Sequence, residues 1–100
     1  MALKKVFIIS CIYTAEYGAI NVDYQNVYAS HKDALDSIME NIGATCEVVG
    51  GEDIYSSDLH KTIRDELIEH GEYRRDWGDG NWYLWKVVES LLNVKEKEEQ

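Results

Sequence analysis

The sequence contains five side chains of the kinds that most often bind metal ions or act as nucleophiles: Cys11, Cys46, His31, His60 and His70. Zinc sites usually draw their ligands from closely spaced pairs of such residues. Here neither two cysteines nor two histidines lie within a few positions of each other. We therefore expect no metal site, and no other motif indicates a cofactor.

Nucleophilic catalysis needs a cysteine or serine beside a histidine and an orienting acid. The chain has no nucleophile elbow and no glycine motif of the kind that binds phosphate. Cys11 lies in an apolar segment, where a cysteine is usually a small buried hydrophobic residue. We expect no catalytic residue and no enzymatic activity. The alternative is a small-ligand-binding or hydrolytic protein that uses Cys11 and a histidine.

Acidic side chains recur at helical spacing in two segments. Asp33, Asp36 and Glu40 are three and four residues apart, so they share one face of a helix with neighbours about 5–6 Å apart. Asp65 and Glu69 belong to a second acidic cluster that also contains basic residues. Each cluster is either an ordinary solvated helix face or a surface that imitates consecutive phosphates and binds a basic groove.

The segment RRDWGDGNWYLW, residues 74–85, is rich in indole rings. Its Asp79-Gly80 pair predicts a two-residue hairpin turn, because both turn positions require a positive φ, which these residues accept. That register places Trp77 opposite Trp82, Arg75 opposite Leu84 and Arg74 opposite Trp85. Cross-strand ring pairs stabilise a hairpin by roughly 0.5–1 kcal/mol each. We interpret Arg74, Arg75, Trp77 and Trp82 either as hairpin surface residues or as anchors of an interface.

The elements that must position these residues follow from hydrophobic periodicity. The patterns predict strands at 6–14, 20–29 and 82–88, a short edge strand at 44–51, and helices at 31–42 and 57–70. Ser30 begins the first helix, Gly43 ends it, and a bulge is expected near Asn26. The first and last strands are apolar on both faces, which is typical of strands covered on both sides.

We therefore predict an α+β fold, a mainly antiparallel β-sheet with two α-helices packed on one face. Residues 1–94 form a single α+β domain, because a chain of this length supports one core. Residues 95–100, KEKEEQ, form a charged tail that we expect to be disordered.

Composition narrows the classes of partner. Nineteen acidic and ten basic residues give a net charge of −9, which argues against direct binding of nucleic acid because such binding depends on neutralising phosphates. No apolar run is long enough to cross a membrane. The chain has only two cysteines, which lie far apart in the sequence and show no C-x-x-C spacing. This favours a reducing, cytoplasmic location, which is the host cytoplasm if the protein is phage-encoded.

Three segments of the chain also carry a family resemblance. The order KKVFIISCIYTAEYG, NVDYQNVYASHKDALDSIMENI and WYLWKVVE resembles a largely uncharacterised group of small acidic α+β proteins from phages and mobile elements of Gram-positive bacteria. The shared features are the VYAS step at 27–30 and the following Asp33-Ala34 pair. The likeness covers roughly residues 4–42 and 82–89 and leaves 43–81 outside. That class includes anti-CRISPR and other anti-defence inhibitors, and the resemblance implies no catalytic residue.

We therefore expect a non-enzymatic protein that binds and inhibits a host protein, with a CRISPR-associated nuclease as one partner of this kind. The expected contact residues are the acidic side chains Asp33, Asp36, Glu40, Asp65 and Glu69 with Arg74, Arg75, Trp77 and Trp82. Either the acidic faces compete with DNA for a basic groove, or an apolar patch locks the partner in an inactive arrangement. The alternative is a self-associating structural or accessory phage protein that forms a homodimer.

Overall fold

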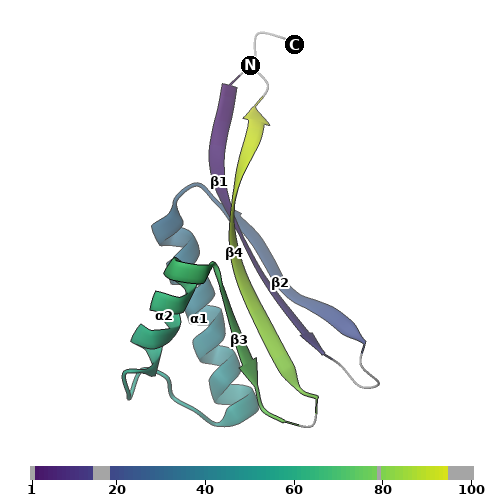
Figure 1. Ribbon diagram of the computed structural model, residues 1–100, viewed down its shortest axis with the longest axis vertical. Coiled ribbons are helices and arrows are strands. Elements are labelled where there is room, and N and C mark those ends of the chain that lie inside the picture. The colour runs from purple at the N-terminus through teal and green to yellow at the C-terminus, as the bar shows by residue number, and fades with distance from the viewer. Residues whose placement is uncertain (1, 15–18, 79, 95–100) are drawn as a thin grey trace.

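The computed structural model describes residues 2–14, 19–78 and 80–94 (Figure 1). Four strands and two helices follow in the order β1 (Ala2–Thr14), β2 (Ile20–Tyr28), α1 (His31–Gly50), α2 (Leu59–His70), β3 (Glu72–Asp76) and β4 (Trp82–Val94). The strands form one antiparallel sheet in the order β2-β1-β4-β3, and both helices lie on one face of it. The predicted α+β architecture is confirmed, while the predicted tail at 95–100 lies outside the described residues.

The two central strands are the apolar ones, as predicted. Alternate side chains of β1 and β4, among them Ile9, Cys11 and Trp85, are fully buried against the helices. The intervening side chains point to the opposite face, which no helix of the described chain covers. The prediction that both strands are covered on both sides is therefore wrong for the described residues.

The bulge in β2 is real but lies earlier than predicted. Cys11 pairs with Tyr24 whereas Ile12 pairs with Val22, so Asp23 is the extra residue and Asn26 lies in regular register opposite Ile9. The extra residue brings Val22 onto the same face of the sheet as Val27. Side chains alternate between the two faces of a strand, so without the extra residue Val22 would lie on the same face as Tyr24. With it, Val22 and Val27 lie on the face opposite the helices, and Tyr24 faces the helices.

Helix α1 is longer than its predicted range of 31–42. The Ser30 side chain accepts a hydrogen bond from the Asp33 backbone N–H at 3.1 Å, as predicted, but the helix continues through 44–51 instead of giving way to an edge strand. Gly43 lies inside the helix, and the Tyr55 ring occupies the space into which a larger side chain at this position would point. Cys46 extends the buried stripe by one turn, and Gly51 ends the helix at φ 64°.

Helix α2 begins two residues later than the predicted 57–70 and ends as predicted, with Gly71 at φ 73°. Its buried Ile63 and Leu67 complete the core against α1 and the sheet.

The hairpin of β3 and β4 is offset by one residue from its predicted register. Asp76 pairs with Trp82 and Arg75 with Tyr83, so Trp77 lies in the loop rather than opposite Trp82. The backbone N–H of Trp77 donates to the backbone carbonyl of Asn81 at 2.9 Å. This hydrogen bond closes a loop that is longer than the expected two-residue turn. This offset moves each side chain of β3 to the face opposite the predicted one, because side chains alternate along a strand.

Beyond the helices, the sheet narrows to a two-stranded arm. The start of β1 pairs with the end of β4 from Leu3 opposite Asn93 to Lys5 opposite Leu91, and this ribbon projects past α1 and α2 (Figure 1). The molecule is therefore elongated, with principal extents of 53 × 33 × 20 Å.

Candidate functional site

Both thiols are buried in the core. Burial, with a smaller contribution from the charge of Asp23, raises the pKa of Cys11 to about 12, and burial also raises the pKa of Cys46. A thiol is nucleophilic only as the thiolate. Both cysteines are therefore protonated at neutral pH and face other core side chains, which argues against Cys11 as a nucleophile.

The three histidines lie at helix ends, His31 at the start of α1 and His60 and His70 at the start and end of α2. His31 packs beside Phe7 with 5.2 Å between ring centroids, and His60 packs beside Tyr55 at 5.6 Å. His70 is exposed in the last turn of α2. Within residues 2–14, 19–78 and 80–94, no three His, Cys, Asp or Glu side chains come together in a metal-binding arrangement.

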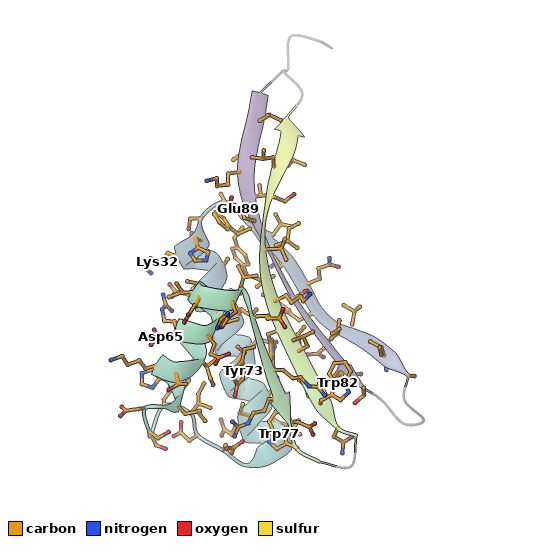
Figure 2. All side chains as sticks on the ribbon, in the orientation of Figure 1. Lys32, Asp65, Tyr73, Trp77, Trp82 and Glu89 are labelled. Carbon is orange, nitrogen blue, oxygen red and sulfur yellow. The ribbon has the colours of Figure 1, made fainter. Side chains whose placement is uncertain are left out.

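The five predicted acidic contact residues all lie on the helices and are exposed: Asp33, Asp36 and Glu40 on α1, and Asp65 and Glu69 on α2. We call the solvent-facing surface of α1 and α2 the helix layer. Residues 31–70 contain ten acidic and three basic side chains, so they carry −7 of the total charge of −9. Figure 2 shows Lys32 and Asp65 on this side of the molecule.

Asp36 differs from the other acidic residues because two cations contact it. The Lys32 ammonium lies 2.6 Å from one carboxylate oxygen and the Arg64 guanidinium 3.2 Å from the other. Hydrogen bonds from Lys32 and then Arg64 lower the pKa of Asp36. This carboxylate therefore links α1 to α2 and is less available to an external partner than Asp33 or Glu40.

Arg75 and Trp77 form a structural contact on the helix side of the sheet. Both bind Glu52, which follows the end of α1. The Arg75 guanidinium pairs with one Glu52 oxygen, and the Trp77 indole N–H donates to the other at 3.2 Å. The Trp77 ring also packs edge-on against Tyr83 with 5.6 Å between centroids. These two predicted contact residues thus connect the hairpin loop to α1.

Arg74 and Trp82 lie on the opposite face of the sheet. The Arg74 guanidinium lies 4.8 Å from the centre of the Trp82 ring, and Arg74 also pairs with Asp76 at 3.7 Å. Figure 2 shows Trp77 and Trp82 near the loop end of the hairpin. Trp85, by contrast, is fully buried, and its indole N–H donates to Asn41 at 2.8 Å.

The predicted contact residues therefore do not form one site. Five lie on the helix layer, two join the hairpin to Glu52, and two lie on the far side of the sheet. The sequence predicts the aromatic hairpin as a single surface. The Asp79-Gly80 pair does not indicate the one-residue offset of the register that places its residues on two faces.

The feature that sequence reasoning missed is the helix-free surface of the sheet, which we call the open face. Two of its rows across β2, β1 and β4 are apolar, Val27-Ile8-Val88 and Val22-Ile12-Leu84, and the row between them is polar: Gln25, Ser10, Lys86 and Glu72. The sequence signal for this surface is that the strands at 6–14 and 82–88 carry apolar side chains on both faces. This pattern predicts cover on both faces but does not say what supplies it.

Comparison with known protein families, curated proteins and solved structures finds no match for this chain. No helix in the described part of the chain is long and apolar enough to cross a membrane. A functional conclusion must therefore come from the geometry and charge of the molecule itself.

Proposed function

We propose that this protein is a non-enzymatic inhibitor that binds a host protein by placing its helix layer in a basic groove, where nucleic acid would otherwise bind. A CRISPR-associated nuclease is one partner of this kind. The observation that supports the proposal is the segregation of charge, since residues 31–70 carry −7 of the net −9, of which −4 lies on α1 and α2 and −3 on the loop that joins them.

The arrangement of the carboxylates suits such a groove. Asp33, Glu40 and Glu47 are exposed and recur every seven residues along α1, which spaces them about 10 Å apart in a nearly straight row. Lys or Arg side chains that line a groove would meet this row as they meet phosphates, through charge-assisted hydrogen bonds. Glu47 extends the row that the sequence predicted from Asp33 and Glu40.

The described residues also support binding over catalysis. The thiols are buried and protonated, and the histidines lie beside aromatic rings or in solvent rather than beside the thiols. A binding role requires no converging reactive groups, only a surface of suitable shape and charge.

The test is capture of host proteins by the immobilised chain at increasing salt, with and without competing duplex DNA. Because screening weakens contacts between exposed charges, we expect retention to fall roughly tenfold or more between about 50 and about 200 mM salt. Added DNA should release the same proteins. Where a CRISPR-associated nuclease is retained, its cleavage of target DNA should be inhibited.

The triple variant Asp33→Asn, Glu40→Gln, Glu47→Gln should lose this retention while its circular dichroism stays unchanged. A matched variant, Asp23→Asn, Glu72→Gln, Glu89→Gln, removes the same charge from the strands and should retain binding. Capture that is insensitive to salt, or lost equally in both variants, would contradict the proposal.

A further inference from the structure

We propose that the open face binds a second copy of this chain, so that two sheets pack face to face with their helix layers outermost. This inference is independent of the groove-binding function, because it concerns the opposite surface of the molecule. The sequence left self-association as an alternative, and the open face now gives it a specific surface.

The open face carries two apolar rows with a polar row between them. In one row Ile8 lies between Val27 and Val88, and in another Ile12 lies between Val22 and Leu84. Val22 is 66% exposed, Val27 53% and Val88 49%. Rows of half-exposed aliphatic side chains favour an interaction site on a folded protein.

Both sides of the central strands carry aliphatic side chains, but the two sides differ in cover. On the helix side, Ile9, Cys11 and Trp85 are fully buried by α1 and its neighbours. On the other side, Ile8, Ile12 and Leu84 are only partly buried and Val88 is half-exposed, and no helix of the described chain lies over them. Strands that are apolar on both faces are typical of sheets covered on both faces, and a second sheet would supply the missing cover.

Charge favours a second copy as the occupant. In the four-stranded part of the open face, the charged side chains Glu72, Arg74, Asp76 and Lys86 sum to zero. Lys86 lies opposite Glu72 in the register, and Arg74 pairs with Asp76. Of the surfaces described above, this neutral one is where two chains of charge −9 can meet with least repulsion.

The packed sheets would also separate the acidic surfaces. With sheets about 10 Å apart and one helix thickness beyond each, the two helix layers would lie roughly 30 Å apart. The Debye length at physiological salt is about 8 Å, so repulsion across that distance is largely screened. Both helix layers would remain free to bind a basic groove.

The size of the surface is adequate for a dimer. The strands contain 13, 9, 5 and 13 residues, and a strand residue covers about 16 Å² of a sheet, so the whole face, with the arm included, has a projected area of roughly 650 Å². Stable interfaces bury about 800 Å² on each partner. The exposed Leu92 extends the apolar surface into the arm.

Sedimentation equilibrium tests the inference on the full chain. From about 10 µM to about 1 mM, we expect the mass to rise toward twice the 11.5 kDa of one chain. Since both valines are half-exposed, Val27→Lys combined with Val88→Lys should fold normally and raise the dimer Kd at least roughly tenfold. The nearly isosteric pair Val27→Thr and Val88→Thr should also weaken the dimer, and it preserves strand propensity if the lysine variant misfolds.

Val48→Lys is the matched control, because it replaces an exposed valine on α1 with the same charged side chain; its dimer should persist. A chain that stays monomeric throughout this range, or a dimer that tolerates both open-face variants, would overturn the inference. So would a dimer that Val48→Lys disrupts equally.

Salt separates this inference from the proposed function. Apolar association between two acidic chains should strengthen as salt screens their repulsion, whereas groove binding by the helix layer should weaken. A monomer that still binds basic partners in a salt-sensitive manner would refute the dimer alone. A dimer that binds no basic partner would refute the proposed function alone.

Discussion

Glu52 is the residue on which the hairpin loop depends. One carboxylate group accepts from Arg75 of β3 and from Trp77 of the loop, and both donors are partly buried. The hydrogen bond from Arg75 is the first cause of the lowered pKa of Glu52. Because the folded state lowers this pKa, the ionised carboxylate stabilises the fold above its ordinary pKa of 4.5, and the contribution is lost as the pH falls through the folded-state value.

We predict that Glu52→Gln lowers the free energy of unfolding by about 1 kcal/mol at pH 7, a modest value because the pair is partly exposed. Urea unfolding at a series of pH values should show the wild type losing this advantage on acidification until the two proteins have equal stability. Glu47→Gln, on the exposed side of α1, should match the wild type at every pH. A constant difference between Glu52→Gln and the wild type from pH 7 to acid would show that the charge is not the cause.

At the scale of elements, the end of α1 and the hairpin loop are packed against each other. The Trp77 indole lies directly over Gly50, in the position that a β-carbon at residue 50 would occupy. Gly50 therefore allows the ring to approach the helix and to donate to Glu52. A glycine at this position is unfavourable for the helix by itself, so the contact with Trp77 explains its presence.

We predict that Gly50→Ala lowers stability by about 1–3 kcal/mol, although alanine has the higher helix propensity, because the ring must move. Thermal unfolding measures the loss. In a Trp77→Leu background, the same substitution should be neutral or stabilising, since the ring is gone. Equal losses in the two backgrounds would mean that Trp77 is not the obstacle.

For the whole molecule, the arrangement of the two layers has one consequence for stability. The helices cover only one face of the sheet, and the helices with the loop between them, residues 31–70, carry −7 of the net charge of −9. A dimer through the open face would add a free energy of association that depends on protein concentration. Folding and association would then be linked.

We predict that the Tm rises by several degrees between about 10 µM and about 1 mM protein, and rises further at high salt. Scanning calorimetry measures both effects. In the Val27→Lys, Val88→Lys variant the Tm should not depend on concentration. A wild-type Tm that is equally constant would argue that the open face is solvated at these concentrations.

Several features could be predicted from the sequence because their signals are local. The cap at Ser30 depends on residues one turn apart, and the helix end at Gly71 depends on a single positive φ. Alternation and helical spacing likewise predicted three of the four strands, both helices and the exposure of Asp33, Asp36, Glu40, Asp65 and Glu69. The short strand β3 was expected only as one side of the hairpin.

Other features were decided by contacts between distant segments. Gly43 is a local stop signal, but α1 continues past it and buries Cys46 one turn later, while the glycine leaves room for the Tyr55 ring. The Asp79-Gly80 pair predicts a tight turn, but the loop that allows Trp77 to reach Glu52 shifts the register by one residue. Short-range patterns thus determined which elements form and which face of each is apolar. Only the tertiary structure decided which apolar face the helices cover, because that depends on where the chain returns to the sheet.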